Sequence, residues 1–383
     1  MIRARLVTRV LSLVLFTAGS FAPAAAQTVG QPVLGLLQGT NTLVRFTTAT
    51  PGTLGAAVVV TGLVAGETLQ AIDYRPANGL LYGMATDGTN AAVRLYTINT
   101  TTGAATVVGS AVTLPTPGAA WDISFNPTVD RIRIINDQDE NARLVPDSGA
   151  LAGDDTNLTP GPVTVGAVAY TNQVAGAATT TLYALNQTTN SLAVIGGING
   201  VPSPNGGLVT DIGPLGITFA GSPAAMDISS SNTAFAVVRP TAGASSLYTI
   251  NLPTGAATLV GSVGDGTLAI DDIAIVDPML TLSPPTGTYT TRQAFDLVLL
   301  ADAQGRSVAS GTVTFDGLDV TSFVAACVRP GAGAGGLISF RCPGVGGPII
   351  GAGMHTISVR LVMNDGSVVQ RAVTWTVVPI IEP

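Results

Sequence analysis

A sixteen-residue internal repeat is the feature that most constrains the fold of this chain. The segment 95–110, LYTINTTTGAATVVGS, returns at 247–262 as LYTINLPTGAATLVGS, with 13 of the 16 positions identical. In each copy, apolar and polar residues alternate on both sides of a Thr-Gly turn. This pattern predicts a β-hairpin whose glycine takes the left-handed conformation. The chain is therefore expected to build its fold from repeated β-units.

Weaker versions of the same hairpin raise the number of expected units to five. The segment 182–197 follows the repeat, and segments that begin at Leu43 and Ala142 share its outline. Two strand-like stretches precede most of the hairpins, for example 71–76 and 80–84 in the second unit. Four-stranded units of roughly 40 to 50 residues are typical of β-propeller blades. The sequence thus predicts an all-β chain with a five-bladed propeller, and six blades is the alternative.

The two ends of the repeat region are each incomplete. The segment 269–275 has no hairpin after it, and the first hairpin, at Leu43, has no leading strand. We expect these two parts to pair and close a ring, because an open ring would leave sheet edges exposed to aggregation.

Ordered short motifs carry a resemblance to a known family. They are IDYRP at 72–76, GLLYG at 79–83, FNPTVDRIR at 125–133, AYTN at 169–172 and TTTLY at 179–183. The series resembles an uncharacterised family of secreted bacterial propellers, domain of unknown function 4394, over roughly residues 33–275. The resemblance implies a propeller and no activity. The stretch 194–214 departs from the family pattern, so the fourth blade is the least well defined.

The first 26 residues have the order of a secretory signal peptide. Three arginines precede an apolar stretch at 10–18, which leads to the small residues Ala24, Ala25 and Ala26. A membrane anchor is the alternative, but a span needs about 20 apolar residues and this run is interrupted by Ser12. We expect cleavage after Ala26, a mature protein that is periplasmic or extracellular, no membrane insertion, and a propeller over 27–277.

From residue 278 to residue 383 the strands become longer and the turns differ. Period-two alternation over about 100 residues predicts an immunoglobulin-like β-sandwich. Cys327 and Cys342 are the only cysteines and both fall here. In an oxidising compartment we expect them to form a disulfide, because a redox pair would need closer spacing. The single histidine, His355, begins a strand in this region and is expected to be a partly buried structural imidazole.

Charge and residue types exclude several functions. All 16 basic residues are Arg, and removal of the three in the signal leaves 13 against 23 acids, a net charge of 13 − 23 = −10. Such a chain is not expected to bind nucleic acid. The absence of Lys excludes Schiff-base chemistry. The predicted propeller has neither His nor Cys, which excludes a Ser-His-Asp triad and zinc or copper sites of the usual ligands there.

The densest acidic run imitates the opening of a calcium-binding loop. Asp137, Asp139 and Asn141 follow the Asp-x-Asp-x-Asn order of such a loop, with Glu140 among them as a further candidate ligand, but Ala142 replaces the glycine that the loop needs and Ser148 replaces its closing Glu. A solvated hairpin tip is the favoured interpretation. We therefore expect no cofactor, and calcium as the preferred ion if a cation binds.

Five aspartates lie on the leading strands of the predicted blades, where they would line the channel of a propeller. They are Asp73, Asp122, Asp227, Asp271 and Asp272. Convergence there would indicate a functional site. The favoured alternative is that each carboxylate accepts hydrogen bonds within its own blade, since Asp73 and Asp122 fall on different registers. Trp121, Tyr74 and Tyr170 are placed to stack on a sugar or to pack in the core.

Two functions follow from these patterns. The first is a secreted, non-catalytic binding or scaffold protein whose propeller loops meet an unidentified extracellular ligand or protein partner, because no catalytic set is visible. The second is a carboxylate-based hydrolase or lyase, with or without an assisting cation, that acts on an extracellular carbohydrate or lactone. Three or more carboxylates at one channel end would favour the second.

Overall fold

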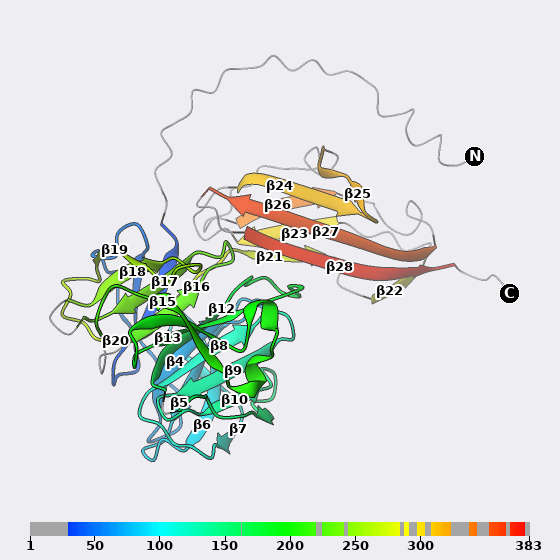
Figure 1. Cartoon of the computed structure of the whole chain (residues 1–383). Coiled ribbons are helices and arrows are strands. Elements are labelled where there is room, and N and C mark those ends of the chain that lie inside the picture. The colour runs from blue at the N-terminus through cyan, green and yellow to red at the C-terminus, as the bar shows by residue number, and fades with distance from the viewer. Residues whose placement is uncertain are drawn as a thin grey trace, which may run out of the picture.

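The chain forms sheets, turns and almost no helix in a computed structural model (Figure 1). The structure describes residues 30–161, 163–219, 224–240, 244–283, 287–290, 297–302, 308–322, 337–342, 352–364 and 368–379. The expected signal peptide and Cys327 lie outside these residues, so cleavage after Ala26 and the disulfide to Cys342 stay predictions. No helix within the described ranges has the length and apolar character needed to span a bilayer.

Five four-stranded antiparallel sheets occupy residues 32–275 of the described chain. Sheet one contains β20 (Ile270–Ile275), β1 (Pro32–Leu37), β2 (Thr42–Thr47) and β3 (Val58–Val59). Sheet two contains β4 (Thr68–Tyr74), β5 (Leu81–Thr86), β6 (Ala92–Ile98) and β7 (Ala105–Thr113). Sheet three contains β8 (Trp121–Asn126), β9 (Arg131–Asn136), β10 (Asn141–Leu144) and β11 (Leu151–Asp154). Sheets four and five follow the same order.

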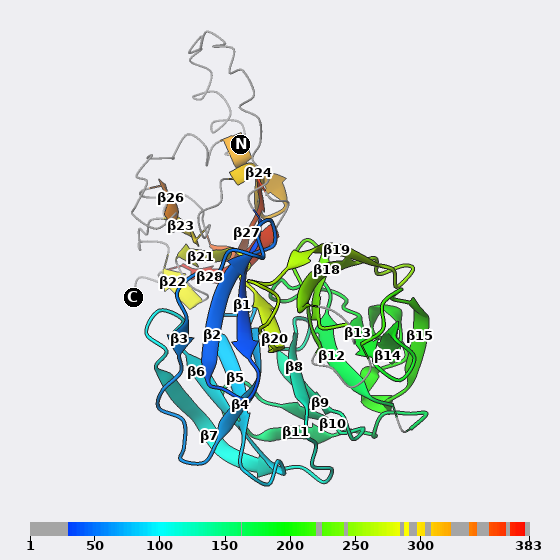
Figure 2. The same ribbon diagram turned by 90° about the vertical axis from the view of Figure 1, so that its left-hand side faces the viewer.

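Sheet four contains β12 (Val165–Tyr170), β13 (Leu182–Asn186), β14 (Ser191–Ile195) and β15 (Val209–Pro214). Sheet five contains β16 (Ala224–Ile228), β17 (Ala234–Val238), β18 (Ser246–Ile250) and β19 (Ala257–Ser262). The leading strands β4, β8, β12, β16 and β20 contact one another in this order, and β20 contacts β4 again. Figure 2 shows the sheets extending outward from these strands.

Sheet one joins the two ends of the repeat region. Strand β20 pairs with β1 in antiparallel register, with Val33 opposite Ile275 and Gly35 opposite Ile273. The predicted pairing of the last leading strand with the first hairpin is therefore confirmed.

The two copies of the repeat form the outer hairpins β6–β7 and β18–β19, as predicted. Their turn glycines, Gly103 and Gly255, have φ of 76° and 81°. A Cβ atom on Gly103 would lie 2.1 Å from the carbonyl oxygen of Val59 in sheet one, and one on Gly255 would lie 2.3 Å from that of Gly213 in sheet four. In both copies glycine permits the hairpin turn to touch the backbone of the preceding sheet.

The core fills the spaces between neighbouring sheets. Between sheets two and three it contains Met84, Leu95, Phe125 and Ile134, all fully buried. All residues of β5, β13, β14, β16 and β17 are buried, because these strands have a neighbouring sheet on each face. This explains the near-continuous apolar runs in the inner strands.

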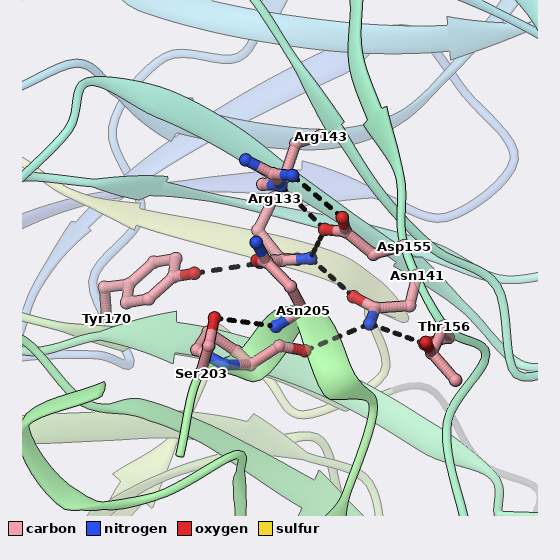
Figure 3. Close-up of polar contacts among 9 residues, drawn as sticks. Arg133, Asn141, Arg143, Asp155, Thr156, Tyr170, Ser203 and Asn205 are labelled. Atoms are coloured by element: carbon pink, nitrogen blue, oxygen red, sulfur yellow. Dashed lines mark hydrogen bonds and ion pairs between the residues drawn. The ribbon is translucent and has the colours of Figure 1, made fainter. Parts of the chain in front are cut away.

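The atypical stretch 194–214 contains two short 3-10 turns, η2 (Ile198–Gly200) and η3 (Pro204–Gly206), before it supplies β15. Arg133 of β9 is 1% exposed and fastens this stretch to sheet three (Figure 3). Its guanidinium donates to Asn141 at 2.7 Å, Asp155 at 2.6 Å and Asn205 at 2.6 Å.

Two further sheets follow residue 278. One contains β21 (Met279–Ser283), β23 (Leu297–Asp302) and β26 (Leu337–Cys342). The other contains β22 (Gly287–Thr290), β28 (Val368–Val378), β27 (Gly353–Met363), β24 (Val308–Phe315) and β25 (Leu318–Asp319). His355 lies in β27, where Nδ1 is 2.8 Å from Asp316 and the ring stacks on Phe315. These contacts are consistent with the structural role that the sequence predicts for the His355 imidazole.

Candidate functional site

Four of the five predicted channel aspartates are brought together by the leading strands. Asp73 in β4, Asp122 in β8, Asp227 in β16 and Asp272 in β20 are each between 1% and 6% exposed. We call these four residues the axial aspartates. Strand β12, of sequence VGAVAY, contributes no acid to this group.

Each axial aspartate links its own strand to the leading strand of the next sheet. In Asp122, Oδ1 accepts from the amide of Ile123 at 2.7 Å and Oδ2 accepts from that of Val168 in β12 at 2.6 Å. In Asp227, Oδ1 accepts from Ile228 at 2.7 Å and Oδ2 accepts from Ile275 at 2.6 Å.

The other two axial aspartates follow the same rule. Asp272 bridges from β20 to β4, and Oδ2 of Asp73 accepts from the amide of Phe125 in β8 at 2.7 Å. Each carboxyl group therefore accepts one hydrogen bond within its own strand, as the sequence favoured, and a second one from the next sheet, which was not predicted. The reason is that neighbouring leading strands lie side by side, so an amide of the next strand is within reach.

Burial raises the pKa of every axial aspartate. The pKa values of Asp73 and Asp122 rise to about 8, and those of Asp227 and Asp272 also rise well above 3.8. The second cause, after burial, is the negative charge of another axial aspartate. The charge of Asp73 raises the pKa of Asp227, and the charge of Asp122 raises the pKa of Asp272. Backbone amides that donate to the carboxylates oppose the shift without cancelling it.

The acidic run at 137–140 does not converge on one point. Oδ1 of Asp137 accepts from the amides of Ala119 and Ala120, while Oδ1 of Asp139 accepts from Val163 at 3.0 Å. Glu140 is fully buried, and Oε2 accepts from Thr116 at 2.8 Å.

The prediction of a solvated hairpin tip is therefore wrong for Glu140. Burial raises the pKa of its carboxyl group. Within the described ranges, no group of three or more His, Cys, Asp and Glu side chains is arranged to hold a metal ion. The acids of this run instead cap backbone amides of nearby loops.

A cavity of about 460 Å³, which we call the mouth cavity, lies where the leading strands begin. All five sheets contribute to it. Its lining residues are Gln38, Gly39, Gln70, Ala119, Ala120, Trp121, Asp137, Thr164, Val165, Gly166, Gln187, Ala224 and Asp271. Asp271 is the predicted channel residue that stands apart from the axial group. Its Oδ2 accepts from the amide of Gly39 at 3.2 Å, and burial raises its pKa to about 6.

The three glutamines of the mouth cavity were not predicted from the sequence, because only acidic and aromatic residues were considered as candidates for the site. Gln38 follows β1, Gln70 lies within β4 and Gln187 follows β13. The available signal was positional, since Gln38 and Gln187 directly follow a strand and Gln70 is the third residue of a leading strand. Of the aromatic candidates, Trp121 lines this cavity, whereas Tyr170 is buried beside Arg133.

A second cavity, of about 340 Å³, lies between the ring of leading strands and β28, and we call it the junction cavity. Asp73, Asp227 and Asp277 line it together with Tyr74, Arg45, Arg75, Gln370 and Arg371. Three carboxylates thus meet at one end of the ring. They are already engaged, since Asp277 accepts from the amide and hydroxyl of Ser230 at 2.8 Å each.

Ser230 also ties the ring to the C-terminal sheets. Its Oγ accepts from the amide of Val368 in β28 at 3.0 Å. The neighbouring Arg75 is fixed by ion pairs with Asp130 and Asp147, both at 2.5 Å. Asp277 and Arg75 therefore hold structural elements in place, as do Asp73 and Asp227.

These features define an all-β protein built from four-stranded antiparallel sheets that share a group of buried carboxyl groups. Residues 42–274 match the profile of the family described as "Domain of unknown function (DUF4394)", and the chain belongs to this family. The resemblance seen in the sequence motifs is thereby confirmed.

Similar solved structures share little sequence with this chain. A Bacteroides thetaiotaomicron VPI-5482 protein of unknown function is 14% identical, with a TM-score of 0.39 and coverage of 67% of this chain and 66% of its own. A Bacteroides uniformis ATCC 8492 protein provisionally named a 6-phosphogluconolactonase is 16% identical, with a TM-score of 0.36 and coverage of 64% and 71%.

An exo-β-1,3-galactanase from Phanerochaete chrysosporium is 9% identical, with a TM-score of 0.36 and coverage of 90% of this chain and 89% of its own. These similarities are too low to assign a fold or an activity. No curated protein matches the chain.

Proposed function

We propose that this chain is a secreted, non-catalytic binding protein made of a five-bladed β-propeller and an immunoglobulin-like module. Its ligand would occupy the mouth cavity. In this proposal each four-stranded sheet is one blade, and the pairing of β20 with β1 closes the ring. The antiparallel three-stranded and mixed five-stranded sheets after residue 278 would form the module.

One observation carries the proposed binding role: all five sheets contribute to one mouth cavity while the axial carboxylates serve the scaffold. Each axial aspartate accepts hydrogen bonds from backbone amides. Groups used in this way hold neighbouring sheets in register. The mouth cavity, by contrast, has the size of ordinary small-molecule sites and combines polar side chains with apolar surface.

The proposed site is tested by filling the cavity. Ala120 is exposed and lines it, so Ala120→Trp should block a ligand without disturbing the core. Ala150, exposed and absent from the lining, provides the matched control Ala150→Trp. Thermal-shift screening of the full chain with extracellular sugars, amino acids and nucleosides should find compounds that raise Tm in the wild type and control only.

Mass spectrometry of each recovered compound tests the non-catalytic part of the proposal. The compound should return unchanged. A chemically altered compound, or a Tm increase that survives Ala120→Trp, would contradict the proposal. So would a screen in which no compound raises Tm.

The meeting of three carboxylates at the junction cavity favours a second candidate, the carboxylate-based hydrolase or lyase. Burial holds the pKa of Asp73 at about 8, so this group would be a proton donor at neutral pH. Activity on carbohydrates or lactones that is lost in Asp73→Asn and kept in Ala120→Trp would support this candidate over the binding role.

A further inference from the structure

We propose that the junction cavity is a second binding site, which takes a short peptide with a free amino group at one end and a free carboxylate at the other. This inference goes beyond the proposed function, because it concerns a different cavity. It follows from three features of the lining: a buried acceptor without a donor, two carboxyl groups without a cation, and two guanidinium groups without a carboxylate.

The buried acceptor is Oε1 of Gln173. Nε2 of this side chain donates to the carbonyls of Phe125 at 3.3 Å and Tyr170 at 3.0 Å, and these two bonds fix the orientation of the amide. Gln173 is 9% exposed, and its Oε1 has no hydrogen-bond partner in the part of the chain that the structure describes. A buried acceptor left unsatisfied costs free energy. Because Gln173 lines the junction cavity, a ligand that brings an N–H donor there is favoured.

The two carboxyl groups without a cation belong to Asp73 and Asp227. Both accept hydrogen bonds from backbone amides, and neither has an ion pair within the described ranges. Burial raises their pKa values, and the neighbouring charges that raise them further are those of other aspartates. Each carboxylate oxygen can accept two hydrogen bonds, so a bound amide leaves one position open. The charged amino end of a peptide would supply both a cation and N–H donors.

The two guanidinium groups without a carboxylate belong to Arg45 and Arg371. Arg75 is held by two ion pairs, whereas Arg45 donates to a backbone carbonyl, which leaves its charge unbalanced. The side chain of Arg371 has no hydrogen bond or ion pair with the described residues. Strand β28 carries Arg371 on the wall of the cavity opposite the ring. A peptide carboxylate is the group that a free guanidinium binds best.

The size and the apolar part of the cavity favour a peptide over a metal ion. The volume is about 340 Å³, and unpaired groups of opposite charge lie on opposite walls. The described residues contain no set of three acids placed to hold a metal ion. Leu80, which is 49% exposed, and Ile98 also line the cavity and would contact apolar side chains of the ligand. A molecule that spans the cavity with one charge at each end matches this arrangement.

The test is titration calorimetry of the full chain with di- and tripeptides of alanine and leucine. Each peptide is compared with its N-acetyl derivative, which lacks the ammonium group, and with its C-terminal amide, which lacks the carboxylate. A free peptide should bind. Each derivative should bind about tenfold more weakly, because a hydrogen bond to a charged group is lost.

Arg371→Gln tests where the carboxylate end lies. It should weaken binding of the free peptide by about tenfold and leave the Kd of the C-terminal amide unchanged, since that derivative has no carboxylate to pair. The fold should be kept, because the Arg371 side chain bonds to no described residue. Arg239 is exposed and absent from the lining, so Arg239→Gln is the matched control that removes the same charge and should leave Kd unchanged.

The outcomes separate this inference from the proposed function. Equal affinity for a free peptide and its derivatives would overturn the inference, and so would equal effects of Arg371→Gln and Arg239→Gln. Peptide binding that Ala120→Trp abolishes would overturn it as well, because the peptide would then occupy the mouth cavity. Absence of binding by every peptide would overturn it and leave the proposed function to be decided by its own thermal-shift screen.

Discussion

Oδ2 of Asp272 accepts a hydrogen bond of 2.6 Å from the backbone amide of Ile72, a residue 200 positions earlier in the chain. Its Oδ1 accepts from Ile273 in its own strand at 2.7 Å. One carboxyl group thus holds β20, the leading strand of sheet one, against β4, the leading strand of sheet two. Similar bridges at the other axial aspartates make the leading strands a hydrogen-bonded group as well as a packed one.

Replacement of Asp272 by Asn should therefore destabilise the ring. Asn keeps one acceptor oxygen but turns an N–H2 group toward one of the two amides, which leaves a buried donor unsatisfied. The cost should be about 1–3 kcal/mol. Urea unfolding of Asp272→Asn measures it, and Asp154→Asn at an exposed position is the control. Equal midpoints for the two variants would show that the bridge contributes nothing.

Stability should fall as pH rises from about 4 to about 8. The unfolded pKa of an aspartate is near 3.8, whereas burial raises those of Asp73 and Asp122 to about 8. The folded state therefore holds more protons in this window, and this contribution to the free energy of unfolding is lost as pH rises through the folded pKa. Urea unfolding at pH 6.0 should give a higher midpoint than at pH 8.5.

The variant Asp73→Asn tests whether Asp73 contributes to this pH dependence, because Asn does not titrate. The difference between the two pH values should become smaller in the variant than in the wild type. A midpoint that is equal or higher at pH 8.5 in the wild type would refute the predicted direction.

Loss of Arg133 should be strongly destabilising, because Arg133→Ala leaves the partly buried Asp155 with one fewer cation and Asn205 with one fewer donor. Breaking a buried pair by removing one partner costs about 3–5 kcal/mol. Arg131 lies two residues away in β9, and its guanidinium donates to the backbone carbonyls of residues 129 and 130. Arg131→Ala should change the unfolding free energy by less than about 0.5 kcal/mol.

Faster proteolysis near Asn205 in Arg133→Ala would locate the effect at the attachment of the atypical stretch. Equal stability of the Arg133 and Arg131 variants would contradict the structural role of this network.

Gly103→Ala should destabilise the protein by more than about 1 kcal/mol, since it combines a left-handed backbone with a Cβ atom 2.1 Å from the Val59 oxygen. Gly88→Ala is the control, because a Cβ atom there meets nothing within 4 Å. Thermal unfolding of both variants distinguishes the two cases. A similar Tm for both variants would mean that the backbone contact between sheets one and two can shift without loss of stability.

The proposed secretion predicts that the thiols of Cys327 and Cys342 are joined in a disulfide and do not react with thiol reagents. Closure of a loop of about 15 residues would stabilise the folded state by roughly 3 kcal/mol in the chain-entropy model. Thiol labelling of non-reduced, denatured protein measures the bond directly. Two labelled cysteines would show that it is absent.

The hairpins and the four-stranded units could be predicted because alternation, turn glycines and repetition are local features. The placement of Asp73, Asp122, Asp227 and Asp272 on leading strands followed from the same patterns. Their partners could not be predicted, since these depend on the register between neighbouring sheets, which no local pattern contains. Glu140 illustrates the same limit, because the amide that it binds belongs to Thr116 in an earlier loop.

The mouth cavity was missed for a related reason. Gln38 and Gln187 are ordinary residues at strand ends, and only the ring of contacts among leading strands brings them to one place. Chemically distinctive residue types attract attention in a sequence, whereas a site made of common amides becomes visible only in three dimensions.

The pairing of β1 with β20 also determines when, during synthesis of the chain, both edges of β1 can be paired. Synthesis runs from the N-terminus, so β1 leaves the ribosome early, while the strand that lies beside it is among the last of the ring to be made. Until residue 275 has emerged, one edge of β1 has no neighbour, and an unpaired edge invites association with other chains. Premature termination within sheet five would therefore produce an aggregation-prone fragment, and a chaperone that shields β1 would have to remain bound through most of translation.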